Sequence, residues 1–292
     1  MRVGRLCYLT AAVFQIPPAP DIVPARSSMS RTAIATLCVG KEYLSQWEKF
    51  CRPNWAYYAQ RHGFDLKVFT APLDTSARAG GRSAAWQKCL ILEALADYDR
   101  VVWLDADIVI NREAPSVTMD VPLGKIGAVI SGDYLHPDLR LFFLRRTIRP
   151  VPVTSADAEE AWRNDQASFY AQAGIACGTH DIVQTGVLVL DPSHRALLRQ
   201  VYDMYPAEMK FAEQLPLSAA ILNSGVLHRM DSKFNTVFVE RAVLHYGYLF
   251  DAGIQKSPMI HQLTTLAVRM ELLNSYFLHF AHEPGYLRYV LE

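Results

Sequence analysis

The sequence has no cysteine framework. Its five cysteines are scattered along 292 residues without a C-x-x-C pair, so the spacing predicts neither a disulfide scaffold nor a zinc clip. They are Cys7, Cys38, Cys51, Cys89 and Cys177. We therefore expect reduced, buried thiols and a cytoplasmic location.

An excess of charge of either sign is also missing. The chain has 29 basic and 29 acidic residues, a formal net charge of zero, and so no overall field that would attract nucleic acid or an anionic membrane. We expect no nucleic-acid partner, and any bound anion must be held by a local site. The 51% of hydrophobic residues is enough for a large buried core.

Long apolar runs are the third absence. The run at 6–14 is too short to span a bilayer, and no small-x-small cleavage site follows it, so we predict neither a transmembrane segment nor an export signal. Met29, directly before the first strand-like run, resembles an alternative start. We expect residues 1–30 to be disordered or not made, and residues 31–292 to form a single domain.

Strand-like apolar runs alternate with helical segments over the first half of the chain. The expected strands are 32–39, 65–70, 100–104, 126–131 and 183–190, and the expected helices are 43–61 and 83–98. This alternation predicts an α/β fold with an open, mostly parallel sheet and helices on both faces.

The second half of the chain is less regular. The polar segment 133–181, interrupted by prolines, predicts an inserted loop or lid. The later elements that we expect are helices at 194–205 and 213–223 and short strands at 226–230, 259–260 and 276–281.

Two carboxylates, Asp105 and Asp107, follow the buried strand at 100–104. Ligands of open α/β sheets bind at the carboxyl ends of the strands, so this pair points to the expected site. Mg²⁺ and Mn²⁺ prefer such hard oxygen ligands and usually take one or two carboxylates plus substrate phosphates. The pair therefore predicts a divalent metal bridged to a diphosphate, where it would stabilise a leaving nucleoside diphosphate.

A second D-x-D provides a control within the same chain, since roughly one such spacing is expected by chance in a chain this long. Asp97 and Asp99 precede the strand, at the opposite edge of the sheet, and predict a solvated turn. Asp105 and Asp107 differ because apolar residues flank them on both sides. The alternative for this pair is a turn with capping aspartates.

The stretch VVWLDADIVI at 101–110 resembles the metal-binding strand of GT-A glycosyltransferases, especially the retaining glycogenin and bacterial lipopolysaccharide galactosyltransferase group. Further segments follow in the order of that group, from about residue 32 to the end. Gly40 and Lys41 resemble its nucleotide-binding segment, and Lys88 matches a basic residue before the metal strand. The QTG at 184–186 is similar to its N-x-G strand, with Gln in place of Asn.

The C-terminal half carries the rest of the resemblance. Glu213 and Gln214 resemble the acidic-Gln pair under the donor sugar, and Asn235 lies in a segment similar to the FN motif. A C-terminal histidine completes the metal site in the family, and both His279 and His261 are candidates. We favour His279 because an aromatic residue follows it, although the family's glycine and K-P-W are missing there.

This resemblance implies metal-dependent transfer of a sugar from a nucleotide-diphosphate donor, UDP by family habit, with retention. Mn²⁺ or Mg²⁺ would be held by Asp105, Asp107 and His279. The implied donor-binding residues are Lys88, Asp105, Gln184, Gly186 and Asn235, and the implied catalytic residues are Glu213 and Gln214. The acceptor, a carbohydrate, lipid or protein, would enter from the side of 133–181.

Two other functions stay open at this point. A nucleotidyltransferase shares the fold type and the metal chemistry, but the sequence after the first strand, CVGKE at 38–42, has no Gly- and Arg-rich loop. A sugar-nucleotide binding protein without catalysis is the second alternative, because of the departures at Gln184 and after His279.

Overall fold

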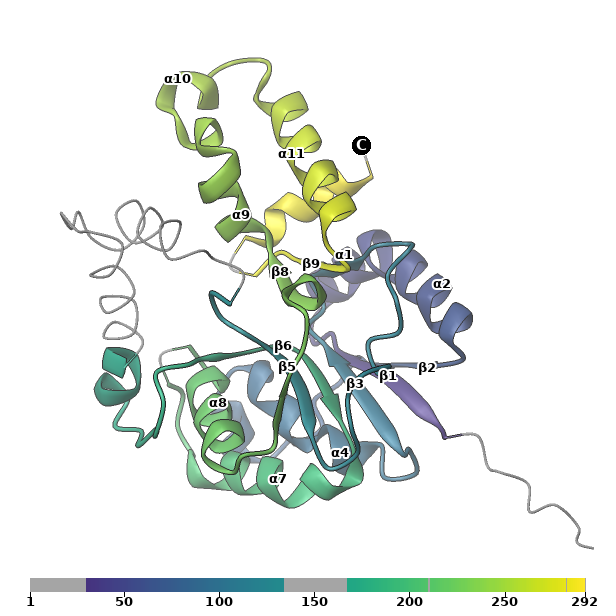
Figure 1. The fold of residues 1–292 in the computed structure, drawn as a ribbon, viewed down its shortest axis with the longest axis vertical. Coiled ribbons are helices and arrows are strands. Elements are labelled where there is room, and N and C mark those ends of the chain that lie inside the picture. The colour runs from purple at the N-terminus through teal and green to yellow at the C-terminus, as the bar shows by residue number, and fades with distance from the viewer. Residues whose placement is uncertain (1–29, 134–166, 210, 282, 292) are drawn as a thin grey trace, which may run out of the picture.

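The computed structural model describes residues 30–133, 167–209, 211–281 and 283–291 (Figure 1). The expectation for residues 1–30 concerns a segment that lies outside these ranges except for Ser30, and most of the predicted insertion at 133–181 also lies outside them. No helix in the described ranges is long and apolar enough to cross a membrane.

A six-stranded sheet forms the centre of the molecule, in the order β2-β1-β3-β6-β5-β7 (Figure 1). The strands are β1 (Thr32–Leu37), β2 (Asp65–Phe69), β3 (Arg100–Leu104), β5 (Ile126–Ile130), β6 (Val183–Leu190) and β7 (Leu227–Arg229). β1 runs parallel to β2 and β3, and β5 runs parallel to β7. β6 runs antiparallel to both of its neighbours. The predicted mostly parallel sheet is confirmed, with β6 as its reversed strand.

Helices cover both faces of this sheet, as the alternation of its apolar residues requires. Ile34, Val102 and Leu104 belong to a core shared with Trp47 and Trp55 of the first two helices. The neighbouring strand residues, Ala33, Val101 and Trp103 among them, belong to a second core on the opposite face. The helices of the first face are α1 (Lys41–Phe50) and α2 (Arg52–His62), and those of the second are η1 (Ala84–Leu90), α4 (Ile91–Ala94), α7 (Arg195–Met204) and α8 (Gln214–Asn223).

A small three-stranded sheet lies beside the large one, in the order β4-β9-β8. Its strands are β4 (Ile108–Ile110), β8 (Thr236–Val237) and β9 (Phe277–His279). β9 pairs antiparallel with β4 so that His279 stands opposite Ile108. The C-terminal strand therefore returns to the chain directly after Asp107. Beyond this sheet lie α9 (Phe238–His245), α10 (Ala252–Gln255) and α11 (Ile260–Asn274) (Figure 1).

Three local predictions need correction. The expected helix at 43–61 is divided at Cys51, and Pro53 stands in the first turn of α2, where its missing N–H is tolerated. The expected helix at 83–98 consists of the 3₁₀ helix η1 and the short α4. The strand expected at 259–260 is wrong, because Ile260 begins α11.

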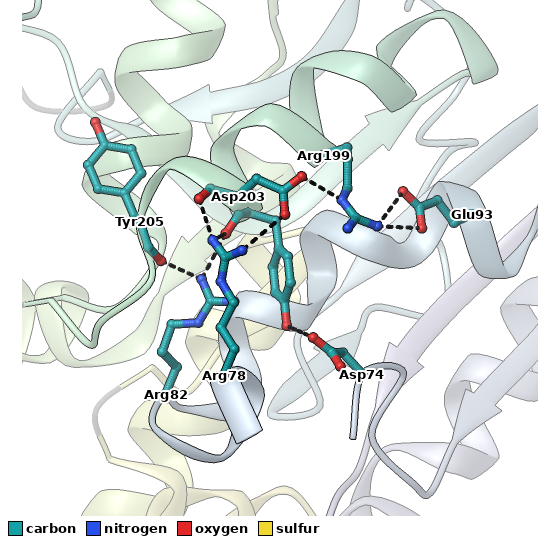
Figure 2. A network of polar contacts seen from close by, with 8 residues as sticks. Asp74, Arg78, Arg82, Glu93, Arg199, Asp203 and Tyr205 are labelled. Atoms are coloured by element: carbon teal, nitrogen blue, oxygen red, sulfur yellow. Dashed lines mark hydrogen bonds and ion pairs between the residues drawn. The ribbon is translucent and has the colours of Figure 1, made fainter. Parts of the chain in front are cut away.

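A polar network fastens the segment before η1 to the end of α7 (Figure 2). Arg82 Nη1 donates to the carbonyl of Tyr202 at 3.0 Å, and Arg78 Nη2 donates to the same carbonyl at 2.9 Å. Cations at the C-terminus of a helix satisfy its free carbonyls and interact favourably with its dipole. Tyr202 in turn donates to Asp74 at 2.7 Å. The network therefore holds the chain directly before η1, the helix that carries Lys88, against α7.

Candidate functional site

Asp105 and Asp107 stand at the carboxyl end of β3, where β4 and β9 meet the central sheet. The Asp105 amide donates to the Gly186 carbonyl at 2.8 Å, and Trp103 Nε1 donates to Asp105 Oδ1 at 2.7 Å. His279 Nε2 lies 3.2 Å from Asp107 Oδ1 and 4.0 Å from Asp105 Oδ2. The structure thus brings together both carboxylates and the favoured histidine. His261 lies elsewhere, exposed on α11 with its ring beside Tyr289.

His279 is buried and fixed from behind by Asn235. Its Nδ1 lies 2.8 Å from Asn235 Oδ1, which can only accept, so Nδ1 carries the hydrogen and Nε2 faces the carboxylates. Burial alone would lower the pKa of His279, but the carboxylates Asp107 and Asp105 raise it. Burial alone would raise the pKa of Asp107, but His279 lowers it through its charge and hydrogen bond. The two side chains therefore favour a charged pair when no cation lies between them.

Gly186 on β6 provides the space for this histidine. A Cβ at Gly186 would stand 2.8 Å from His279 Nδ1 and 3.3 Å from Asp105 Oδ2, and it would approach His279 Cε1 more closely still. A contact of this kind forces one of the partners to move. The absence of a side chain at this position is what lets the imidazole pack against the strand.

Lys88 joins Asp105 to Glu213 in a buried ion-pair chain. Its Nζ lies 3.0 Å from Asp105 Oδ1 and 2.7 Å from Glu213 Oε1, and it donates to the Thr185 carbonyl at 3.2 Å. The Thr185 hydroxyl donates to the same oxygen of Glu213 at 2.9 Å. Burial alone would lower the pKa of Lys88, but the two carboxylates outweigh it and raise that pKa. Lys88 is therefore a charged group that compensates two acids.

These residues surround a cavity of about 390 Å³. The predicted site residues that line it are Lys88, Asp105, Asp107, Gln184, Gly186, Glu213, Gln214 and His279. Gln184 is buried, and its Oε1 has no hydrogen-bond partner among the described residues. A buried acceptor without a partner is costly, so this oxygen is suited to a ligand donor.

A second cavity, of about 380 Å³, meets the first at the carboxylates. Ala85, Asp105 and Asp107 line both cavities. The second is also lined by Val39 and Tyr43, which flank the Gly40 and Lys41 that the resemblance associates with a nucleotide. Asp105 and Asp107 thus stand between two adjoining spaces.

The carboxylates of Asp105 and Asp107 and the imidazole of His279 are ligand types that suit a hard divalent cation. Their atoms do not surround a common point as metal coordination requires. Within the described ranges, no group of three or more His, Cys, Asp or Glu side chains has the arrangement of a metal site. The His279–Asp107 contact of 3.2 Å is a hydrogen-bonding distance. A cation would have to enter between these two side chains and displace the proton that they share.

Trp103 and Thr185 also contribute contacts to the site, and the sequence predicts a role for neither. The apolar pattern predicts only that Trp103 is a strand residue, whereas its indole N–H donates to Asp105. Thr185 lies between the predicted Gln184 and Gly186, and its carbonyl and hydroxyl bind Lys88 and Glu213. The Asp97–Asp99 pair is exposed at the start of β3, as predicted.

No protein-family model matches the sequence, and no curated protein matches it either. Among solved structures, the chain is similar to a glycosyltransferase involved in the glycosylation of the major capsid of PBCV-1, with 12% identity and a TM-score of 0.49 over 89% of this chain and 98% of that one.

It is also similar to the galactosyltransferase LgtC in complex with donor and acceptor sugar analogs, with 15% identity and a TM-score of 0.44 over 85% of this chain and 87% of that one. The glycosyltransferase GlyE of Streptococcus pneumoniae TIGR4 is 13% identical to this chain, with a TM-score of 0.42 over 90% of this chain and 61% of that one. All three are glycosyltransferases, the class that the sequence resembles.

Proposed function

We propose that the protein is a metal-dependent glycosyltransferase that takes a sugar from a nucleotide-diphosphate donor, a UDP-sugar, and transfers it with retention. The observation that carries the proposal is the convergence of Asp105, Asp107 and His279 with the Lys88–Glu213 pair on one cavity. Carboxylates at the carboxyl end of a strand, beside a buried cation and a second adjoining cavity, suit a diphosphate flanked by a sugar and a nucleoside.

Asp105, Asp107 and His279 would hold Mn²⁺ or Mg²⁺. Asn235 accepts a hydrogen bond from Nδ1 of the imidazole, so that Nε2 faces the two carboxylates. Histidines that bind a metal through one ring nitrogen are commonly held in this way through the other. A bound cation would stabilise the negative charge that develops on the leaving diphosphate. In its absence His279 and Asp107 neutralise each other.

The other side chains position the donor. Lys88 holds the carboxylates of Asp105 and Glu213 in fixed places, which is the preorganisation that electrostatic catalysis needs. Lys88 would not bind the diphosphate directly, because its Nζ already has three protein partners. It would act on the diphosphate through Asp105 and through its positive charge. Gln184 Oε1 would accept a hydrogen bond from a hydroxyl of the donor sugar.

Glu213 and Gln214 stand at the start of α8 and line the same cavity. The Glu213 carboxylate would stabilise positive charge on the sugar ring as the bond to the diphosphate lengthens. Gln214 Nε2 donates to the Val183 carbonyl at 3.4 Å, which holds its side chain at the start of β6.

Turnover tests this proposal. UDP release from UDP-glucose and UDP-galactose is measured with and without Mn²⁺ for the wild type, for Asp105→Asn/Asp107→Asn, and for Asp97→Asn/Asp99→Asn, the same spacing at the exposed edge of the sheet. We expect Mn²⁺-dependent release that the first pair abolishes and the second leaves intact.

The alternatives predict different results. Binding of UDP without release from either sugar nucleotide would indicate a binding protein without catalysis. Release of pyrophosphate from UTP and a sugar phosphate would indicate a nucleotidyltransferase. Equal activity of the two double variants would contradict the assignment of Asp105 and Asp107.

A further inference from the structure

The two oxygens of the Asp105 carboxylate have different surroundings. Oδ1 accepts from the indole Nε1 of Trp103 at 2.7 Å and lies 3.0 Å from Lys88 Nζ. Oδ2 lies 4.0 Å from His279 Nε2 and would stand 3.3 Å from a Cβ at Gly186. A carboxylate oxygen has about two lone-pair sites, so two donors use the accepting capacity of Oδ1. Oδ2 is therefore the oxygen that a cation beside His279 would bind.

Trp103 reaches Asp105 because the two residues stand two positions apart at the end of β3. Side chains at i and i+2 of a strand lie on the same face of the sheet. Trp103 is 3% exposed and stands opposite Ala35 of β1 and Leu188 of β6. Its ring is thus held on both sides by paired strands, which gives the indole N–H a fixed direction.

The hydrogen bond to Asp105 has a possible explanation in packing alone, since a buried indole N–H usually finds a partner. Trp47 provides a comparison within the same chain. It is 2% exposed, and its Nε1 has no hydrogen-bond partner among the described residues. An indole can therefore be buried in this protein without an acceptor. The Trp103 ring also lines the second cavity, beside Asp105 and Asp107, so its N–H acts at the edge of the site.

The two donors to Oδ1 differ in kind. Lys88 carries a compact charge on a flexible stem, with three donors that can rotate. Its Nζ lies 5.6 Å from the Trp103 ring centroid and is shared with Glu213 and the Thr185 carbonyl. The indole has a single donor on a rigid ring. Lys88 therefore supplies charge to the carboxylate, whereas the indole supplies direction.

We propose that Trp103 is a positioning residue for the metal site, and that its indole N–H holds Asp105 Oδ1 so that Oδ2 is turned toward the cation. The inference rests on the proposed function and adds to its metal site a residue that does not itself bind the metal. Core packing requires the ring of Trp103, and the metal site requires its N–H.

The affinity for Mn²⁺ measures this role without relying on turnover. Mn²⁺ is titrated by calorimetry in the presence of UDP into the wild type and into Trp103→Phe, which keeps an aromatic ring but lacks the N–H. We expect the affinity to fall at least tenfold, since contacts that orient a metal ligand typically contribute about 10–100-fold.

Trp86→Phe is the matched control. The Trp86 indole also donates to a carboxylate, that of Glu208 at 3.3 Å, but neither residue lines either of the two cavities. This variant loses the same kind of hydrogen bond outside the site. Its affinity for Mn²⁺ should stay within twofold of the wild type.

A second variant separates the hydrogen bond from the packing of the ring. Trp103→benzothienylalanine keeps two fused rings and has a sulfur in place of the N–H, so the core stays filled. Its affinity for Mn²⁺ should fall as much as that of Trp103→Phe. The EPR spectrum of the bound Mn²⁺ should also broaden in both variants, because a carboxylate that is no longer fixed gives the ion less uniform surroundings.

The behaviour of the wild type separates the two proposals. If it binds no Mn²⁺ in the presence of UDP, the proposed function fails and this inference fails with it. If it binds Mn²⁺ but both Trp103 variants bind within twofold of it and give the same EPR spectrum, the positioning role is overturned while the proposed function stands. An equal loss in Trp86→Phe would also overturn the positioning role, because the effect would then not depend on Asp105.

Discussion

Two buried cations on one short segment have different surroundings. Lys88, 2% exposed, is paired with the carboxylates of Asp105 and Glu213 beside the cavity. Arg82, 8% exposed, donates to the carbonyls of Tyr202 and Tyr205 at the end of α7. Its guanidinium also lies 4.0 Å from the Tyr202 ring centroid. Lys88 therefore neutralises two carboxylates in the site, whereas Arg82 binds free carbonyls at the end of a helix.

The difference predicts which of the two cations affects ligand binding. The Arg82 network orders the chain before η1, and its partners would be satisfied whether or not a ligand is bound (Figure 2). The Lys88 network controls two carboxylates that line the cavity. Changes at Arg82 should affect stability alone, whereas changes at Lys88 should affect stability and ligand binding together.

The largest effect is expected for Lys88→Met. Removing one partner of a buried ion pair leaves the others uncompensated, which costs about 3–5 kcal/mol. Urea denaturation should show this decrease, and the further change Glu213→Gln should restore part of it by removing one of the stranded charges. A loss below about 1 kcal/mol would show that the pairing is unimportant.

A smaller loss is expected for Arg82→Met, about 2–3 kcal/mol, because the end of α7 loses a charge and its hydrogen bonds. Calorimetric affinity for UDP with Mn²⁺ should stay within twofold of the wild type. A large decrease in that affinity would remove the distinction between the two cations.

Gly186→Ala disturbs the site at His279 without removing a charge. The added methyl group should displace His279, at a cost to stability of about 2 kcal/mol. The affinity for Mn²⁺ in the presence of UDP should fall at least tenfold, since outer contacts that orient a ligand typically contribute about 10–100-fold. Unchanged affinity would show that His279 is not required.

The smallest effect is expected for Arg199→Ala. Arg199 pairs with Asp203 at 2.8 Å and Glu93 at 3.3 Å, but it is largely exposed. Exposed pairs contribute about 0.2–1 kcal/mol, so the urea midpoint should change little. A loss as large as that of Arg82→Met would show that the whole network acts as one unit.

The sequence predicted the position of the carboxylates because this depends on local patterns. An apolar run followed by Asp105 and Asp107 indicates a buried strand and its carboxyl end. Asp97 and Asp99 precede the same run, which predicts the exposed position that they have. The strand predicted at 259–260 is wrong, because so short an apolar run does not distinguish a strand from the start of a helix.

The contacts between distant segments could not be predicted from spacing. Lys88 meets Glu213, and His279 meets Asp107, through the packing of whole elements. The chain pattern likewise gives no sign of the left-handed backbone of Phe211 and Ala212, since neither Phe nor Ala favours that conformation. The resemblance implies roles for Lys88 and His279, whereas only the structure identifies their buried partners, Glu213 and Asn235.

Calorimetric titration of UDP and GDP, with and without Mn²⁺, into the wild type and Asp105→Ala/Asp107→Ala tests the central claim most directly. We predict UDP binding that requires Mn²⁺ and disappears in the double variant, while the Tm confirms that the variant is folded. Binding that is independent of the metal, or equal in the double variant, would contradict the assignment of the carboxylate pair as the metal–diphosphate site.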